Sequence, residues 1–481
     1  MPEEKRYLCW DQKLLETAND VEVRMHHPER ANVALYCDNE WEGHHNGYAG
    51  VLRVGDEYRM YYRADSSRHI VDENMSHRSR GVICVAVSRD GKTFKKPNVG
   101  KYEYNGTKNN NIVFSRESFI DNFAVFYDTN PDCPEDERFK ALSEDRNNGV
   151  EGLAYYASAD GYDFRFERFL PVKGTFDSYN VTLWDPDRKK YFLFYRAFHA
   201  PDGTDWFDFK GMNIYEVIRD IRVATSEDFV NWTEHGRITF DEGQEDYQLY
   251  INQISKYYRS QDVFLGFPIR YYDRAAERRN FDFMPLADRH RAIYDKYRRE
   301  GTAVTDCAIM TSSDGFVFDR RDEAFITPGI EARDNWWYGN CGTAYGMVET
   351  ESETPGAPNE ISMYVNENYR IKNVNFVRVT LRLDGFFSWY GKFKRGEVIT
   401  KPLTASADGM RVNFSSSALG GMRITLLDGK GNEIEGYKSY TMFGDSVDRP
   451  VEFEKSLSEL RGKTVKLKIE LSDCQLYSFV I

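Results

Sequence analysis

Short apolar runs separated by polar turns follow one another along most of the first 396 residues. The runs are rich in β-branched and aromatic residues and are bounded by turn-forming residues, which predicts β-strands. Five of them lead into the same kind of turn, and these five span residues 82–87, 153–157, 221–224, 308–310 and 376–381. The chain is therefore expected to be built mainly from strands.

The shared turn reads Ser-x-Asp-Gly-x-x-aromatic, and it recurs at a nearly constant interval. Complete copies start at Ser88, Ser158 and Ser312, a looser copy starts at Ser226, and a degraded copy lies around Asp384. The aspartates of successive copies are 70, 68, 86 and 70 residues apart. Asp-Gly between a strand and an aromatic residue favours a tight turn, because Gly accepts a positive φ and Asp bonds to nearby backbone. The spacing indicates an internal repeat.

Each repeat holds four expected strands. In the first repeat, residues 48–54 form an apolar run, residues 57–63 an aromatic-rich run and residues 82–87 the run before the turn, and a fourth strand follows the turn. A recurring four-stranded sheet cannot bury both of its faces alone, and radial stacking of the repeats solves this. The fold is therefore predicted to be all-β, a five-bladed β-propeller, with one long β-sandwich as the alternative.

Two segments depart from the repeat. Residues 272–301 are Arg-rich and predict an amphipathic helix inserted after the second strand of a blade, either simply solvated or overhanging the central funnel as a partial lid. From Val398 onwards apolar and polar residues alternate strictly, which predicts a half-buried antiparallel sheet. We therefore divide the chain into residues 1–396, an N-terminal segment plus the propeller, and residues 397–481, a C-terminal β-sandwich.

Composition and charge argue against several partners. The net charge is −13, from 64 Lys and Arg against 77 Asp and Glu, whereas nucleic-acid binding needs a basic surface. No apolar stretch approaches the length of about 18 residues that a membrane span needs, and the N-terminus lacks the apolar core of a signal peptide. We expect neither nucleic acid nor membrane as a partner and a cytoplasmic location, with a secreted protein trimmed of its leader as the alternative.

Cysteine and histidine usage favours neither disulfides nor a metal site. The seven cysteines are scattered without a Cys-x-x-Cys pair and lie mostly in apolar runs, which favours reduced core thiols. Only nine histidines are present, and the adjacent His44 and His45 point to opposite faces of a strand, so they cannot bind one ion together. No metal and no cofactor is expected, and the sequence predicts no particular oligomeric state.

An acidic residue precedes the first strand of every repeat. In a propeller these first strands surround a central funnel where ligands bind. The five acids are Glu42, Asp121, Asp177, Asp246 and Asp334. A single acid in a loop is as often a turn cap as a functional group, but five acids at equivalent positions are expected to converge on the funnel.

Arginine ends the second strand in three repeats, at Arg63, Arg196 and Arg270. Such a guanidinium is a fork-shaped donor for sugar hydroxyls or for an anionic group, and the alternative is a structural ion pair with a neighbouring carboxylate. Further substrate-binding candidates near the funnel are Trp41, Asn46, Tyr179 and Trp336. The aromatic rings among them offer flat apolar faces to a sugar, or else pack between blades.

Together these features resemble the five-bladed glycoside hydrolases. The chain shares acids before the inner strands, turns such as Ser226-Glu-Asp-Phe-Val-Asn-Trp232 and an appended C-terminal β-sandwich. The layout is most similar to glycoside hydrolase family 32, the invertases and fructanases, and next to the family 43 arabinanases and xylosidases. The resemblance implies hydrolysis, or transfer, of glycosidic bonds in short oligosaccharides, with a furanosyl unit as the expected sugar.

The motifs match family 32 only in part. Asp121 falls where the family has the Asp of Arg-Asp-Pro, and Asp177 stands in place of the family's Glu on the third blade. The Asn-Asp-Pro motif of the first blade is absent, and Glu42 or Asp38 is the nearest acid. The resemblance implies a catalytic set of Asp121, Asp177 and Glu42 on a divergent member of this scaffold, without ordering their roles.

Glycosidic cleavage requires two carboxyl groups, one that protonates the leaving oxygen and one that acts as nucleophile or base. Asp121 and Asp177, on adjacent blades, are the predicted pair, with carboxyl groups within about 10 Å of each other. Two other functions stay open. One is a sialidase-like hydrolase that holds an anionic sugar with the arginine cluster, and the other is a non-catalytic carbohydrate-binding propeller.

Overall fold

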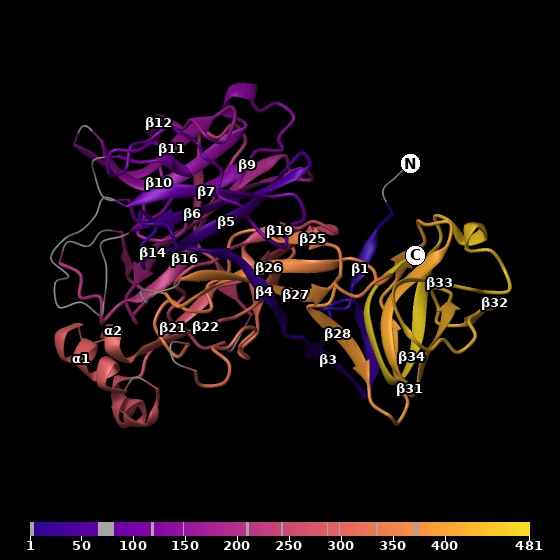
Figure 1. Ribbon diagram of the computed structural model, residues 1–481. Coiled ribbons are helices and arrows are strands. Elements are labelled where there is room, and N and C mark those ends of the chain that lie inside the picture. Colours follow the sequence, from indigo (N-terminus) through magenta and orange to yellow (C-terminus); the bar gives the residue numbers. More distant parts are fainter. Residues whose placement is uncertain are drawn as a thin grey trace.

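The computed structural model describes residues 4–65, 81–116, 120–147, 149–207, 211–241, 244–285, 287–297, 299–332, 335–369 and 374–481. Five sheets form the blades of a β-propeller, and a further sheet containing the C-terminal strands lies beside it (Figure 1). The predicted all-β, five-bladed fold is confirmed.

Blades 1 to 3 are built from strands in chain order. Blade 1 contains β5 (Gly47–Val54), β6 (Glu57–Ala64), β7 (Val82–Ser88) and β8 (Ile112–Phe114). Blade 2 contains β9 (Ala124–Tyr127), β10 (Phe139–Asn147), β11 (Val150–Ser158) and β12 (Arg165–Phe169). Blade 3 contains β13 (Val181–Asp185), β14 (Lys190–His199), β16 (Ile218–Ser226) and β17 (Thr233–Arg237), and β15 (Asp205–Trp206) pairs with β14.

Blades 4 and 5 recruit strands from elsewhere. Blade 4 contains β19 (Ser255–Tyr257), β20 (Ser260–Gly266), β23 (Met310–Ser312) and β24 (Val317–Arg320), with β18 (Thr239–Phe240) parallel to β24. Blade 5 contains β25 (Val348–Thr350), β26 (Glu360–Glu367), β27 (Asn375–Arg382) and, as its fourth strand, β4 (Glu29–Tyr36).

The expectation that the strand after Asp384 completes blade 5 was wrong. That strand, β28 (Phe387–Gly391), pairs with β34 and β3 of the neighbouring sheet instead. The fourth place is filled by β4 from near the N-terminus, which pairs with β27. A strand that precedes the first blade in sequence therefore completes the last blade and closes the ring.

The three complete turn motifs and the looser copy at Ser226 share one geometry. Ser88 Oγ donates to Asp90 Oδ1 at 2.9 Å, and the same carboxylate oxygen accepts the N–H groups of Lys92 and Thr93 at 2.8 and 3.2 Å. Equivalent bonds surround Asp160, Asp228 and Asp314. Each motif joins the third strand of its blade to the fourth, as the repeat predicted.

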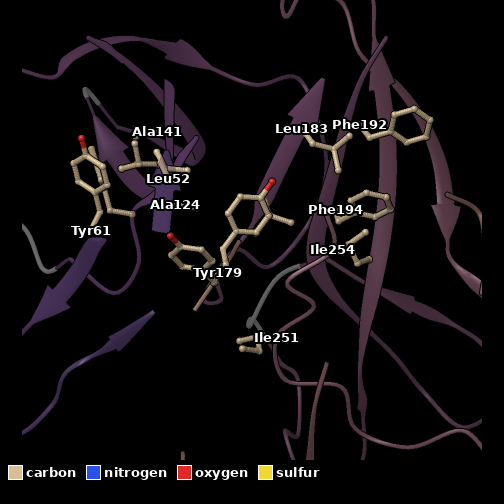
Figure 2. Packing of buried hydrophobic residues seen from close by; sticks show 14 of the residues in the cluster. Leu52, Tyr61, Ala124, Ala141, Tyr179, Leu183, Phe192, Phe194, Ile251 and Ile254 are labelled. Atoms are coloured by element: carbon tan, nitrogen blue, oxygen red, sulfur yellow. The ribbon is translucent and has the colours of Figure 1, made fainter. Parts of the chain in front are cut away.

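Side chains between neighbouring blades form the core of the propeller. Figure 2 shows Leu52 and Tyr61 of blade 1, Ala124 and Ala141 of blade 2, and Phe192 and Phe194 of blade 3, all of them buried in one cluster. Alternate residues of a strand point to opposite faces of its sheet, so each blade presents apolar residues to the blades on both sides. Radial stacking thus buries both faces of a four-stranded unit.

A helical segment interrupts blade 4, as predicted. It separates β21 (Ile269–Asp273) from β22 (Ala303–Cys307) and consists of η2 (Ala275–Phe283), α1 (Ala287–Tyr297) and α2 (Arg299–Thr302). Ile293 of α1 packs in a buried cluster with Tyr338 and Tyr369. The insertion therefore packs against Tyr338, which precedes blade 5, and Tyr369, which lies between β26 and β27 of blade 5, and whether it acts as a lid or is simply solvated stays open.

The neighbouring sheet is built on two long strands, β31 (Met410–Leu427) and β34 (Thr464–Val480). Its shorter members are β28, β29 (Gly396–Thr400), β30 (Leu403–Thr404), β32 (Glu433–Lys438), β33 (Asp445–Val451), β1 (Arg6–Leu8), β2 (Leu15–Asn19) and β3 (Val21–Met25). Alternate residues such as Phe414, Ile424 and Leu467 face one buried core. The sheet therefore draws strands from both sides of residue 396.

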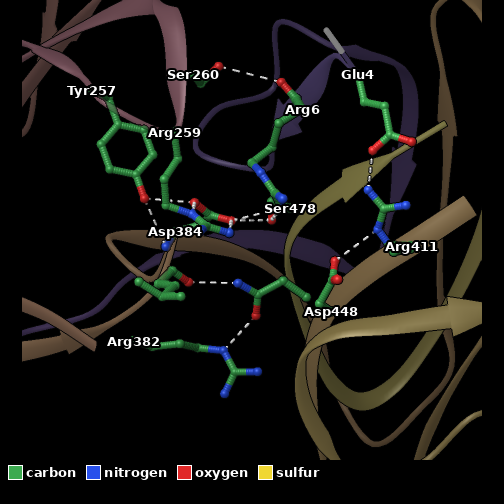
Figure 3. Close-up of polar contacts among 12 residues, drawn as sticks. Glu4, Arg6, Tyr257, Arg259, Ser260, Arg382, Asp384, Arg411, Asp448 and Ser478 are labelled. Carbon is green, nitrogen blue, oxygen red and sulfur yellow. Dashed lines mark hydrogen bonds and ion pairs between the residues drawn. The ribbon is translucent and has the colours of Figure 1, made fainter. Parts of the chain in front are cut away.

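Asp384 ties the propeller to this sheet (Figure 3). Its fully buried carboxylate accepts hydrogen bonds from Tyr257 Oη at 2.7 Å, Arg259 Nε at 2.8 Å and Ser478 Oγ at 2.6 Å, and from Arg6 Nη1 at 3.2 Å. Burial acts to raise the pKa of this carboxyl, but the guanidinium groups of Arg259 and Arg6 outweigh it, and the pKa is lowered. The aspartate of the degraded fifth turn motif thus joins the propeller to the neighbouring sheet.

All seven cysteines are buried free thiols, as the sequence predicted. Among the described residues, no helix has the length and apolar character needed to cross a bilayer.

Candidate active site

Asp121 and Asp177, which precede the first strands of blades 2 and 3, are each paired with a buried arginine. Arg63 Nη1 lies 2.7 Å from Asp121 Oδ1, and Arg196 Nη1 lies 3.4 Å from Asp177 Oδ1. The two arginine side chains are 1% and 2% exposed, whereas the aspartates are 23% and 29% exposed. Each of the two partly exposed aspartates is therefore bonded to an arginine side chain that is itself buried.

Glu144, near the end of β10, is a third acid in this region. Its N–H donates to Asn122 Oδ1 at 3.1 Å, and its carbonyl accepts from Arg116 Nη2 at 2.7 Å. Burial, followed by the negative charges of Asp177 and Asp121, raises the pKa of Glu144 to about 8. Glu144 therefore holds its proton at neutral pH beside the two carboxylates.

Sequence reasoning missed Glu144, although a signal was present. Glu144 occupies in blade 2 the place that Arg196 occupies in blade 3. The Arg196 N–H donates to Asn180 Oδ1 at 3.0 Å, just as the Glu144 N–H donates to Asn122 Oδ1 at 3.1 Å. The signal is an acid in the second strand of blade 2 at the position where blade 3 carries Arg196.

Tyrosine rings surround the two arginines. The Arg63 guanidinium lies 4.7 Å from the centre of the Tyr48 ring, and that of Arg196 lies 4.9 Å from the Tyr250 ring. Together with Tyr338 and Tyr369, the side chains of Arg63, Tyr48 and Tyr250 line a cavity of about 40 Å³. A cavity of this volume has room for a few water molecules and is too small for a sugar ring.

Glu42, the third predicted catalytic acid, has other partners. Its fully buried carboxylate accepts from Lys96 Nζ at 2.6 Å, Tyr62 Oη at 2.5 Å and the Asn39 N–H at 2.7 Å. Burial raises its pKa despite these contacts. Among the contacts of the described residues, none joins Glu42 to Asp121 or Asp177, so its predicted role stays a prediction.

Arg270 and Asp246 take part in separate ion pairs. Arg270 binds Asp306 through Nε at 2.7 Å and Nη2 at 2.6 Å, which links β21 to β22. Asp246 Oδ2 lies 2.6 Å from His199 Nε2, and its side chain is 56% exposed. Each of the three arginines forms an ion pair with an aspartate, Arg63 with Asp121, Arg196 with Asp177 and Arg270 with Asp306, and their predicted convergence on a substrate stays a prediction.

The remaining candidates make local contacts. Trp41 Nε1 donates to Asn111 Oδ1 at 2.9 Å, and Trp336 Nε1 donates to Gly329 O at 3.0 Å. Asn46 and Tyr179 are fully buried, and the Tyr179 ring stacks on that of Tyr48 with centres 6.1 Å apart. Asp334 lies outside the described residues. Tyr179 thus backs a ring that lines the cavity.

Comparison with known proteins gives structural matches only. No family model and no curated protein matches the chain. A solved glycoside hydrolase is 11% identical, with 74% of this chain and 92% of that chain covered and a TM-score of 0.45. An N-acetylgalactosamine deacetylase from F. plautii, in complex with blood group B trisaccharide, is 11% identical over 92% and 95% of the two chains, with a TM-score of 0.44.

A third match is a GH32 β-fructofuranosidase from Bombyx mori. It is 9% identical, with 94% of this chain and 93% of that chain covered and a TM-score of 0.41. Glycoside hydrolases are therefore among the solved structures to which this chain is similar. The function must be derived from the chain's own site residues.

Proposed function

We propose that the chain is a glycosidase in which Glu144 donates the proton and Asp121 and Asp177 are the catalytic carboxylates. The observation that carries this proposal is the pKa of Glu144, which burial and the charges of Asp177 and Asp121 raise to about 8. Glycosidic cleavage requires one carboxyl group that stays protonated near an ionised one. Two carboxylates held by arginine beside a protonated glutamic acid meet that requirement.

In the proposed reaction, Glu144 transfers its proton to the glycosidic oxygen as the bond to the anomeric carbon breaks. Positive charge develops on the sugar ring, and the negative charges of Asp121 and Asp177 stabilise it. We assign attack on the anomeric carbon, or activation of the attacking water, to Asp177. Its ion pair with Arg196 is 3.4 Å long, against 2.7 Å between Asp121 and Arg63, so Asp177 is the less tightly held of the two acids and Asp121 the more firmly fixed one.

The arginine contacts favour a neutral sugar over a sialoside. A sialidase needs its arginines to bind the carboxylate of the substrate. Here Arg63 and Arg196 are each engaged by an aspartate of the site, and Arg270 is bound to Asp306. We further propose that the sugar is a furanosyl unit of a short oligosaccharide, which the sequence resemblance to family 32 supports.

The substrate class can be tested by incubating the purified protein with fructosyl, arabinosyl and xylosyl oligosaccharides and with sialosides. The proposal predicts release of a monosaccharide from one of the neutral furanosides. Cleavage of sialosides alone would support the sialidase alternative. Saturable binding without release from any sugar would support a carbohydrate-binding propeller.

A further inference from the structure

Arg63 has hydrogen-bonding partners both on the side that faces Asp121 and on the side away from it. Nη1 donates to Asp121 Oδ1 at 2.7 Å and to its carbonyl oxygen at 2.8 Å. Nη2 donates to Tyr369 Oη at 3.1 Å and contacts His45 Nε2 at 3.2 Å. Because the side chain is 1% exposed, bulk water cannot replace these partners. The guanidinium orientation is therefore set by the groups on Nη2.

Those groups form a hydrogen-bonded chain that continues into the protein. Tyr369 Oη lies 2.7 Å from His45 Nε2, and His45 Nδ1 lies 3.3 Å from Asp65 Oδ2. Arg63 can only donate, so Tyr369 Oη accepts from it, and we assign the Tyr369 hydrogen to the bond with His45 Nε2. With this assignment Nε2 accepts, and Nδ1 carries the ring hydrogen and donates it to Asp65. Each contact from Arg63 to Asp65 then pairs a donor with an acceptor.

The chain joins three blades. His45 precedes β5 and Asp65 follows β6 in blade 1, Tyr369 follows β26 in blade 5, and Asp121 precedes β9 in blade 2. His45 and Asp65 are 1% and 0% exposed. The partners of Arg63 therefore come from blades 1, 2 and 5, and its hydrogen bonds connect the start of blade 2 to the other two blades.

The placement of Tyr369 also depends on Gly339. A Cβ atom at Gly339, where φ is 86°, would lie 2.0 Å from Cδ1 of the Tyr369 ring. Only glycine allows the ring to lie so close to that backbone. The ring edge lies beside His45, with centres 5.2 Å apart, and the side chain lines the 40 Å³ cavity next to Arg63.

We propose that Tyr369, His45 and Asp65 are positioning residues for Asp121 and act through Arg63. The inference rests on the glycosidase proposed above, in which Asp121 stabilises the charge on the sugar. Misplacing a catalytic group by about 1 Å costs a hundredfold in rate. Loss of one hydrogen bond of the chain is therefore expected to lower kcat while leaving KM nearly unchanged.

The test compares Tyr369→Phe with Tyr364→Phe. Both remove one buried hydroxyl from blade 5, but Tyr364 Oη donates to the Gly91 carbonyl and has no role at Arg63. Tyr369→Phe is expected to lower kcat by about tenfold to a hundredfold at unchanged KM, whereas Tyr364→Phe keeps the wild-type kcat. His45→Gln, whose side-chain oxygen still accepts from Arg63, is expected to keep more activity than His45→Leu. Equal kcat values for Tyr369→Phe and Tyr364→Phe would overturn the proposal.

A crystal structure of Tyr369→Phe separates this proposal from the glycosidase assignment. The positioning role predicts that the 2.7 Å contact between Arg63 and Asp121 shifts or is lost in the variant, whatever the protein hydrolyses. An unchanged contact would overturn the positioning role even in an active enzyme. If the wild-type protein cleaved no glycoside but the contact moved, the proposed function would fail and the positioning chain would stand.

Discussion

The negative charge of Asp177 acts on the carboxyl group of Glu144 and raises its pKa. Burial and the charge of that aspartate are the two largest influences that raise the pKa of Glu144 to about 8. The two acids therefore carry different charges at neutral pH although they come from adjacent blades. This difference assigns the proton donor, because an ionised carboxylate has no proton to give.

Activity is expected to fall as the pH rises through about 8, because Glu144 then loses the proton it must donate. Glu151, which is 56% exposed, is a further negative charge that raises this pKa. Glu151→Gln should therefore lower the pKa and move the alkaline fall of kcat/KM to lower pH, with the maximal rate unchanged. A pH–rate profile of the two proteins measures the shift. An alkaline limb that stays in place, or moves to higher pH, would contradict the coupling.

Asp121→Asn and Asp177→Asn are nearly isosteric changes that remove a catalytic charge. Each is expected to lower kcat by about 100-fold to 10,000-fold. Each also leaves a buried arginine without its counter-charge, so a lower melting temperature is expected and circular dichroism checks that the variant is folded in the assay. Asp136→Asn, on an exposed pair with Arg165 in blade 2, is the matched control and should keep full activity. Near-full turnover by both site variants would remove these aspartates from the mechanism.

Most of the fold could be predicted from local sequence patterns. The Ser-x-Asp-Gly turns repeat because each blade needs the same bond from Ser to Asp and the same backbone N–H groups at the Asp, as at Ser88 and Asp90. Such bonds lie within a few residues of one another and leave a sequence signature. The closure of blade 5 by β4 left none, because the pairing of Asn375 with Tyr36 joins residues far apart in the chain.

The site was predictable only where residue type and strand position coincided. Asp121, Asp177, Arg63 and Arg196 became candidates because acids precede inner strands and arginines end second strands, and the structure pairs each of these acids with one of these arginines. Glu42 sits at the same kind of position, yet Lys96 and Tyr62 bind it inside the fold. Glu144 could be identified only from the structure, because its raised pKa depends on burial and on charges from a neighbouring blade.

Asp384→Asn should destabilise the junction between the propeller and the neighbouring sheet. It leaves Arg259 and Arg6 without their buried counter-charge, and breaking a buried ion pair costs about 3–5 kcal/mol in the free energy of unfolding. Urea denaturation measures this loss. Asp445→Asn, on an ion pair whose acid is 63% exposed, is the control and should change little.

The same carboxyl group makes stability depend on pH. Its pKa is lowered in the folded state, so its contribution is fully present above the pKa of the unfolded chain, about 3.9 for Asp. That contribution is lost as the pH falls through the lowered folded value. Wild-type protein should therefore lose stability in acid more steeply than Asp384→Asn, and parallel losses in the two proteins would argue against this role.

Gly161→Ala should cost more stability than Gly106→Ala. Both glycines have positive φ, 78° and 82°, so alanine carries a backbone cost of about 1–2 kcal/mol at either site. At Gly161 a Cβ would also lie 2.5 Å from Tyr61 Oη and 2.8 Å from the Phe139 ring, whereas nothing lies within 4 Å at Gly106. The crowding adds about 1–3 kcal/mol. Equal losses in thermal unfolding would show that the turn of blade 2 does not pack against blade 1 as described.

The central claim, that Glu144 protonates the leaving group of a glycoside, is tested most directly by Glu144→Gln on two kinds of substrate. A sugar leaving group needs the proton, whereas a dinitrophenolate leaves without it. We expect kcat/KM to fall by about 100-fold to 10,000-fold for the oligosaccharide and by less than about tenfold for the dinitrophenyl glycoside. Glu135→Gln, an acid 89% exposed in the same blade, should match wild type on both. Equal losses on the two substrates, or no loss on either, would contradict the assignment of Glu144 as the proton donor.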